Sequence, residues 1–250
     1  MRGNLLLRYA IAFALLATAS PTLAGTVSGS LKIDKAKHPS PPERSRGYVA
    51  RTPHPLLAGK PVENPFPSMF VVLSGGDLGE DAATPARRPV ELELVGQRFA
   101  RDVFPVMVGQ LLLIKNVSKR TANKGVTPRI DAPGNRDVFA NPGDAGTPIN
   151  HNGERELTLK KAFSPVELRD LDSIHLRTKL VGVPHKHFAA PNRAGKFELT
   201  DVPAGSWTVR VWYQDGWLRG AERKVTVTAK GKATVNINIP PAMQVEAAGK

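Results

Sequence analysis

Short runs in which apolar and polar residues alternate with a period of two recur along this chain and limit what it can fold into. Residues 26–33, 90–95 and 233–239 show this alternation, which is the pattern of a half-buried β-strand. Clusters of Gly, Pro, Asn and Asp separate the runs, and no segment has a convincing helical periodicity. About ten short strands with turn signals between them predict an all-β protein of the sandwich type.

Two segments depart from this alternation. Residues 69–73 are continuously apolar and predict a short buried strand, which the turn signal at 74–77 ends. Residues 35–67 contain eight prolines, which remove backbone donors and fix φ. We interpret this second stretch as an extended surface excursion or a linker.

The N-terminus has the pattern of a secretory signal peptide over residues 1–24. Arg2 and Arg8 provide the positive charge, and the apolar run at 9–19 is too short for a membrane-spanning helix, which needs roughly 20 residues. Thr22-Leu23-Ala24 places small residues at the positions that a signal peptidase requires. We expect cleavage before Gly25, a periplasmic or secreted location, and no membrane span.

Composition narrows the classes of function. The chain has no cysteine, which excludes disulfides and thiol nucleophiles. Removal of Arg2 and Arg8 leaves 33 basic residues against 22 acidic ones. This excess favours an acidic protein or an anionic polysaccharide as partner and leaves nucleic acid open, while solubility alone is the simpler alternative. No G-x-S-x-G, H-E-x-x-H or phosphate-loop motif is present, so we expect no enzymatic activity.

Residues 195–209 carry a specific motif. Their order, Gly-Lys-Phe-Glu-Leu-Thr-Asp-Val-Pro-Ala-Gly-Ser-Trp-Thr-Val, resembles the G-x-F-x-L-x-x-V-P-x-G signature of carboxypeptidase-regulatory-like, transthyretin-type β-sandwich modules. The motif places Phe197 and Leu199 in a core and requires an unusual backbone conformation at Gly205. Trp207 then lines the returning strand as a structural residue. Such a signature predicts a fold and says little about function.

The middle of the chain resembles the plastocyanin-like (cupredoxin) part of periplasmic proteins of the methylamine-utilisation-like type. The opening Gly-Thr-Val-Ser-Gly at 25–29 and the segments 99–110 and 115–116 carry the resemblance. It implies a cupredoxin-like Greek-key sandwich followed by the transthyretin-type module. The expected domains are a signal peptide at 1–24, a first strand and Pro-rich excursion at 25–66, a cupredoxin-like domain at 67–184, the second module at 185–240 and a tail at 241–250. We expect the second module to pair with the strand at 25–33.

The copper ligands of that family are mostly absent here. The loop after Asn116 has no histidine, and of the later C-x-x-H-x-x-M ligands only His175 is retained. A type 1 site needs two histidines and a thiolate, so we expect no cofactor. The alternative is copper bound outside the family's site by His185 and His187, which share one face of an extended segment, with His175 as a further ligand.

Two more groups of residues are candidates for binding. A basic group in the loop where the family keeps its copper is the candidate partner surface, and it comprises Lys115, Lys119, Arg120, Lys124 and Arg129. Trp212 and Trp217, beside Gln214 and Asp215, are candidates for a carbohydrate-binding platform if they are exposed. The alternative is that Trp212 lies in the core and Trp217 covers a sheet edge.

Overall fold

A computed structural model describes residues 24–33, 64–76, 78–86, 88–95, 98–117, 127–173, 175–240 and 243–247. The predicted signal peptide, apart from Ala24, and most of the Pro-rich excursion lie outside these residues. Within them the chain has β-strands and short 3-10 turns but no α-helix. No helix in this part of the chain is long and apolar enough to cross a membrane. The all-β prediction is confirmed.

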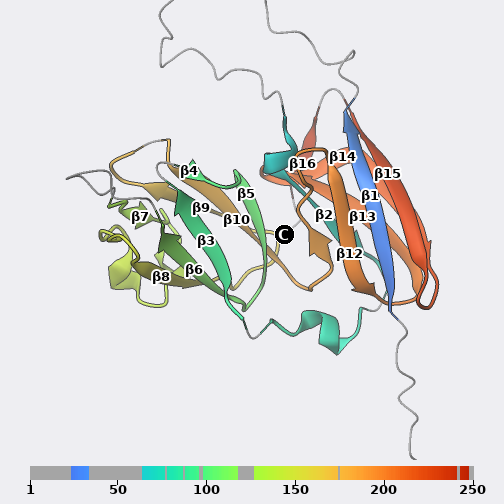
Figure 1. The fold of residues 1–250 in the computed structure, drawn as a ribbon, viewed down its shortest axis with the longest axis horizontal. Helices are drawn as coiled ribbons and strands as arrows, with labels where there is room; N and C mark the ends of the chain where they lie inside the picture. Colours follow the sequence, from blue (N-terminus) through green and yellow to red (C-terminus); the bar gives the residue numbers. More distant parts are fainter. Residues whose placement is uncertain are drawn as a thin grey trace, which may run out of the picture.

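The strands form two β-sandwiches that lie side by side (Figure 1). The C-terminal sandwich has a three-stranded sheet, in the order β12-β1-β15, and a five-stranded sheet, in the order β11-β2-β13-β14-β16. Its strands are β1 (Gly25–Ile33), β2 (Met69–Ser74), β11 (Phe188–Ala189), β12 (Lys196–Val202), β13 (Gly205–Tyr213), β14 (Gly216–Val227), β15 (Lys232–Ile239) and β16 (Val245–Ala247). β1 pairs antiparallel with β12 and parallel with β15.

The motif at 195–209 builds the core of this sandwich. Phe197, Leu199 and Trp207 are buried in one apolar cluster, as the alternation along β12 and β13 predicts. The indole Nε1 of Trp207 donates a hydrogen bond of 2.8 Å to the carbonyl of Pro203. Gly205 has φ of +152°, a conformation that residues with a Cβ rarely adopt. These residues are therefore structural.

The central sandwich is built from residues 90–183. Its two sheets have the orders β4-β3-β6-β8 and β5-β10-β9-β7, and each contains one parallel pair, β3 with β6 and β5 with β10. The strands are β3 (Val90–Val95), β4 (Arg98–Phe99), β5 (Val103–Met107), β6 (Leu111–Asn116), β7 (Ile130–Asp131), β8 (Glu154–Thr158), β9 (Pro165–Asp170) and β10 (Arg177–Val183). Short 3-10 turns occur at Phe66–Ser68, Glu80–Ala83, Arg136–Val138 and Pro142–Asp144.

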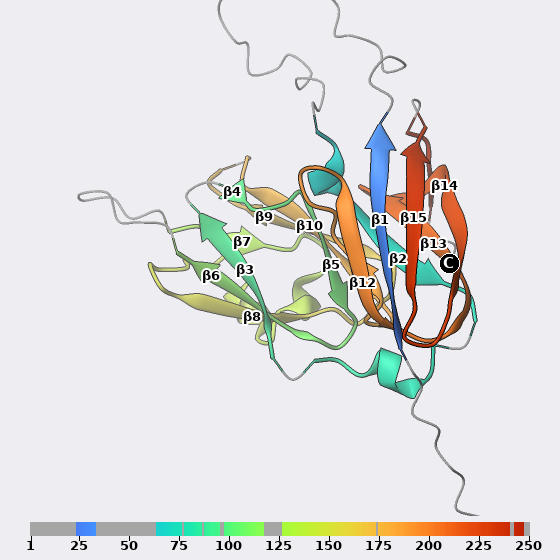
Figure 2. The same ribbon diagram turned by 45° about the vertical axis from the view of Figure 1, so that its right-hand side comes forward.

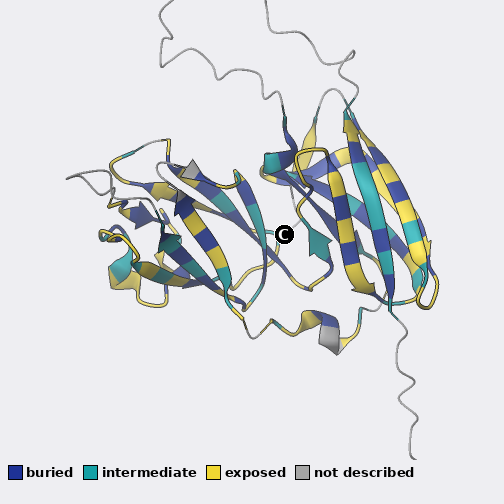
Figure 3. Ribbon diagram, viewed as in Figure 1, coloured by how far each residue is buried: buried dark blue, intermediate teal, exposed yellow. Residues whose placement is uncertain are grey.

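The two sandwiches share a third apolar cluster, which we call the junction. It joins the outer side of the five-stranded sheet to the outer side of the β5-β10-β9-β7 sheet, and the turned view in Figure 2 shows these sheets facing each other. Its buried members are Phe70, Val72, Val103, Val181, Val183, Trp212 and Trp217. Strand β2 is consequently buried on both faces, as Figure 3 shows in dark blue.

Strand β2 also corrects the domain division. The boundary at residue 67 assigned Met69–Ser74 to the cupredoxin-like domain, but β2 pairs with β13 and β11 of the C-terminal sandwich. The physical reason is that a fully apolar strand needs cover on both faces, and only the position between the two sandwiches provides it. Arg101 adds polar contacts there, because its guanidinium donates to the carbonyls of Phe66, Met69 and Pro191 at 2.8 to 3.0 Å.

Candidate functional site

A polar cleft of about 410 Å³ opens beside the junction. Residues from both sandwiches line it, namely Ser68, Asp102, Val103, Glu167, Arg177, Thr178, Lys179 and Gln214. Lys179 of β10 crosses to Asp215 in the β13–β14 turn, with 2.6 Å between Nζ and the carboxylate. Ser68 donates to Asp102 at 2.7 Å. Clefts between domains are common ligand sites, and this one is lined mainly by charged and polar groups.

Two arginines lie directly opposite each other next to this cleft. Arg169 of β9 and Arg177 of β10 are register partners in the antiparallel pair, and both are exposed on its outer side. Like charges placed opposite each other in a sheet are destabilising. Neither guanidinium has an ion-pair partner among the residues that the structure describes. This arrangement places two positive charges side by side, with Asp131 opposite Arg169 on β7 and Glu167 opposite Lys179 as the carboxylates on the same side of the sheet.

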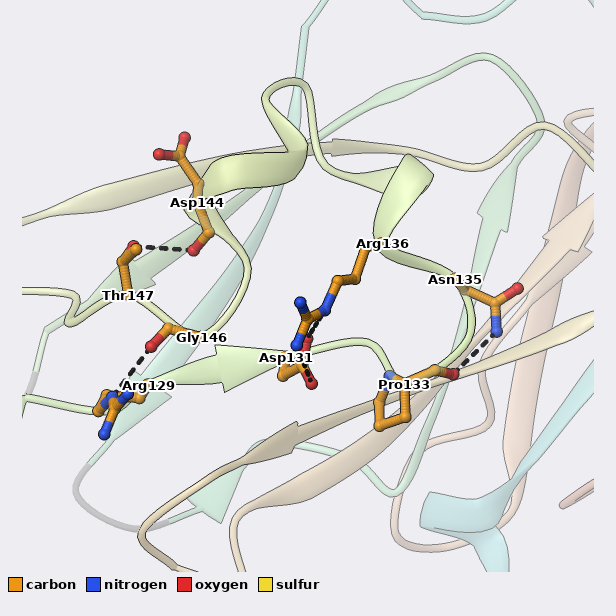
Figure 4. Close-up of polar contacts among 8 residues, drawn as sticks. All are labelled: Arg129, Asp131, Pro133, Asn135, Arg136, Asp144, Gly146 and Thr147. Carbon is orange, nitrogen blue, oxygen red and sulfur yellow. Dashed lines mark hydrogen bonds and ion pairs between the residues drawn. The ribbon is translucent and has the colours of Figure 1, made fainter.

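Arg129 and Arg136 extend this positive region at the β7 edge (Figure 4). Arg136 pairs with the buried carboxylate of Asp131, at 3.0 Å from Nε to Oδ1. Arg129 donates from Nε to the carbonyl of Gly146 at 2.9 Å and lies 3.9 Å from Asp172. Because Asp131 is the register partner of Arg169, these residues border the same sheet face. We call Arg129, Arg136, Arg169, Arg177 and Lys179 the basic face; among the described residues Arg129, Arg136 and Lys179 each have a carboxylate partner, and Arg169 and Arg177 are the members without one.

The predicted basic group around the copper loop is only partly described. Lys115 lies between two carboxylates, at 2.6 Å from Glu91 and 3.3 Å from Glu154, which raise its pKa. Its charge is thus already balanced within the central sandwich. Lys119, Arg120 and Lys124 lie outside the described residues. Of the predicted group, Arg129 is the member that belongs to the basic face.

The two tryptophans do not form the candidate carbohydrate platform, because both are buried, and Trp212 lies in an apolar cluster as the alternative has it. Trp212 is 0% exposed and Trp217 is 7% exposed. Their rings meet edge to face at 5.1 Å, and Phe70 stacks on Trp212 at 5.8 Å. The guanidinium of Arg210 covers the ring of Trp217 at 4.2 Å. Burial at the junction removes both of these rings from any surface on which a sugar could stack.

The structure brings together two of the three candidate metal ligands. His185 and His187 are both buried, with ring centroids 6.0 Å apart, whereas His175 is exposed in the β9–β10 turn. Desolvation, and next the neighbouring His187, lower the pKa of His185 to about 4. Desolvation also lowers the pKa of His187. The described residues contain no group of three or more His, Cys, Asp or Glu that could hold a metal ion.

Sequence reasoning did not find Arg169, Arg177 or Arg101 as important residues. The two cross-strand arginines are separated by seven residues, so only a hairpin register for 165–183 would have placed them opposite each other. The sequence does alternate around Val166 and Leu168, which is the signal that could have predicted β9. For Arg101 no local signal exists, because its carbonyl acceptors lie at residues 66, 69 and 191.

Comparison with known proteins adds little. No family model matches the chain, and no curated protein matches it. Among solved structures, a reduced variant of amicyanin aligns with 45% of this chain and 97% of its own length, at 14% identity and a TM-score of 0.29. An oxidised amicyanin variant covers 44% and 98%, at 16% identity and a TM-score of 0.29. The similarity to this cupredoxin is weak, and the description of the fold given above rests on the sheets themselves.

Proposed function

We propose that this chain is an exported, non-enzymatic binding protein that docks an acidic protein on its basic face. The observation that carries the proposal is the cross-strand pair Arg169–Arg177, which lacks an ion-pair partner among the described residues. Adjacent like charges cost folding stability. A partner that brings carboxylates to this face offsets that cost, so binding and relief of repulsion act together.

The chemistry of the basic face favours carboxylates. Arginine presents a planar fork of donors that matches a carboxylate in a bidentate manner. The excess of 33 basic over 22 acidic residues that remains after the expected cleavage accelerates the approach of any acidic surface. Residues 118–126, which contain Lys119, Arg120 and Lys124, directly precede Arg129 in the sequence. We propose that they add to the same docking surface.

The burial of the aromatic residues favours an acidic protein over an anionic polysaccharide as the partner. Protein sites for sugars commonly use exposed rings, and Trp212 and Trp217 are buried at the junction. The basic face instead offers guanidinium groups on a regular sheet, in the order β10-β9-β7. This surface suits ionic contacts with side chains of another protein. Nucleic acid and polysaccharide are the alternatives that the experiment must separate.

Binding to three polyanions tests the proposal. Polyglutamate stands for an acidic protein, alginate for an anionic polysaccharide and single-stranded DNA for nucleic acid. We expect R169E/R177E to lose polyglutamate binding at least about tenfold at 0.1 M salt, where the Debye length is about 10 Å, and all binding to weaken at 1 M salt. The matched control R223E/K224E changes the charge equally at exposed positions of β14 and should bind almost as the wild type does.

The outcomes separate the possibilities. Equal losses in both double variants would mean that net charge alone attracts the polyanion. If alginate or DNA binds more strongly than polyglutamate, and this binding depends on Arg169 and Arg177, then that polymer rather than an acidic protein is the class of partner. A third variant, K119E/R120E/K124E, measures the contribution of the preceding loop. Export is tested independently, because N-terminal sequencing of the mature protein should begin at Gly25-Thr26-Val27.

A further inference from the structure

His185 and His187 form a buried pair at the edge of the C-terminal sandwich, away from the basic face. The exposed fraction is 9% for His185 and 2% for His187. The peptide N–H of Leu73 donates to the carbonyl of His187, which extends the pairing of β2 with β11 by one residue. Lys186, between them, is exposed. The two imidazoles therefore point into the protein while the lysine points to solvent.

Both imidazoles have a nitrogen that the described chain leaves without a partner. The Nδ1 atoms of His185 and His187 are buried and make no hydrogen bond. A buried polar atom without a partner is destabilising, and such atoms are rare in native proteins unless a water or an ion completes them. Two of them on neighbouring rings indicate a shared ligand.

Backbone carbonyls lie near both rings. Those of Leu73 and of His185 itself act on His185, and that of Thr200 acts on His187. Histidines that bind metals almost always donate their other N–H to a carbonyl or carboxylate, and these carbonyls are available for that contact.

We propose that His185 and His187 bind one monovalent copper ion between their Nδ1 atoms. A metal–imidazole bond of about 2.0 Å places each ring centroid about 3 Å from the metal, so opposed rings have centroids roughly 6 Å apart. The observed separation is 6.0 Å, with 38° between the ring planes. The ion is held by two neutral nitrogens, and no thiolate is involved.

The number and type of ligands select the ion. Zinc takes four ligands in tetrahedral geometry, and no third His, Cys, Asp or Glu joins the pair within the described residues. Imidazole suits copper, and closed-shell Cu⁺ accepts two nitrogens in line. Burial adds a second reason, because transfer of an ion from water into an apolar site becomes more costly as its charge increases. A single positive charge is the least costly case.

Both proposed ligands lie in the segment between β10 and β11, outside the strands of the central sandwich. His185 keeps an exposed fraction of 9% there.

Anaerobic titration of the full chain with Cu⁺, against a chromogenic chelator of Cu⁺, tests the proposal. We expect saturation at one ion per chain and an X-ray absorption spectrum with two nitrogen ligands. H185Q/H187Q should lose more affinity than the roughly 10–100-fold that loss of an outer-shell partner causes. The matched control H151Q/H175Q also removes two histidines, both exposed in the structure, and should retain the wild-type affinity.

A second measurement covers the case in which H185Q/H187Q fails to fold. The wild-type chain has six histidines, and Ag⁺ is a redox-inert substitute for Cu⁺. Nitrogen NMR with Ag⁺ should shift the Nδ1 signals of His185 and His187 and leave those of the other histidines unchanged. The absence of saturable binding, binding retained in a folded H185Q/H187Q variant, or shifts at other histidines would each overturn the proposal. The basic-face experiment is independent of all three outcomes.

Discussion

The two ends of strand β10 present the same outer side to very different surroundings. At its C-terminal end, Val181 and Val183 are fully buried in the junction. At its N-terminal end, Arg177 is exposed and Lys179 is half-buried beside the cleft. The side chains follow one alternation along one strand. The difference is whether the sheet of the C-terminal sandwich covers them, so the apolar end stabilises the protein and the basic end remains available for a partner.

The largest expected effect is that of Trp212→Ala, which removes a ring from the junction at the apolar end of β10. Trp212 is 0% exposed and contacts both Phe70 and Trp217, so its loss should cost roughly 3–5 kcal/mol of unfolding free energy. Each sandwich has its own core, and we expect the wild type to unfold in urea in one transition and the variant in two. Binding of polyglutamate by the folded variant should not change.

Leu171→Ala is the control for this variant, because Leu171 is 43% exposed in the β9–β10 turn. Its loss should change the unfolding free energy by less than about 0.5 kcal/mol. A cost below about 1 kcal/mol for Trp212→Ala would contradict the junction, since a tryptophan buried between two sheets cannot be removed so easily.

A second test uses pH, because the histidine pair lies beside the apolar end. The pKa of His185 is about 4 in the folded chain, against about 6.5 when unfolded, so below pH 6.5 the unfolded chain takes up the proton more readily. Stability should be complete above pH 6.5 and should fall as the pH drops to 4, with His185 accounting for on the order of 3 kcal/mol. The lowered pKa of His187 acts in the same direction.

Urea unfolding at pH 7 and pH 4.5 measures this effect in the metal-free protein. His185→Gln should flatten the pH dependence, whereas His175→Gln, at an exposed position, should leave it unchanged. The charged neighbours Lys186 and Asp201 also act on His187, so the comparison is made between variants rather than from one curve. The same slope in His185→Gln would show that other groups cause the loss.

The strands themselves could be predicted from sequence, but the contacts between distant segments could not. The alternation at 195–209 predicted Phe197, Leu199 and Trp207 in a core, and they are buried there. The apolar run of β2 predicted burial, but the choice of β13 as its neighbour depends on residues more than 130 positions away. Long-range pairing of this kind leaves no local pattern, which is why the boundary at residue 67 was wrong.

The candidate sites show the same limit. Trp212 and its neighbour Val211 are both buried because β13 is covered on two faces, and a period-two pattern cannot distinguish this from a strand with one exposed face. Lys115 was proposed as part of the partner surface, but Glu91 and Glu154 flank it from other strands. The His185–His187 pair could be predicted, because two histidines at i and i+2 of an extended segment share a face.

At the basic end we expect a smaller effect of opposite sign. Arg169→Gln removes one of two like charges in a cross-strand pair and should raise the unfolding free energy at low salt by up to about 1 kcal/mol. The same variant should bind polyglutamate more weakly, because the guanidinium fork is lost. Arg223→Gln is the control, since its register partner is the uncharged Val209. A loss of stability in Arg169→Gln would mean that an anion or a carboxylate already balances this pair.

The smallest effect concerns Asp215, which keeps Lys179 away from any partner. The ion pair between them measures 2.6 Å and joins the two sandwiches across the cleft, but Asp215 is 55% exposed. Exposed pairs contribute about 0.2–1 kcal/mol, and salt weakens them. Asp215→Asn should therefore cost about 0.5 kcal/mol at low salt and almost nothing at 1 M salt. The released lysine then adds its charge to the basic face, so polyglutamate should bind the variant more tightly than the wild type.

Lys179→Met loses the same ion pair but also the charge, and it should bind more weakly. If both variants bind alike, Lys179 belongs to the junction rather than to the docking surface, and the boundary between the two ends of β10 lies at Arg177.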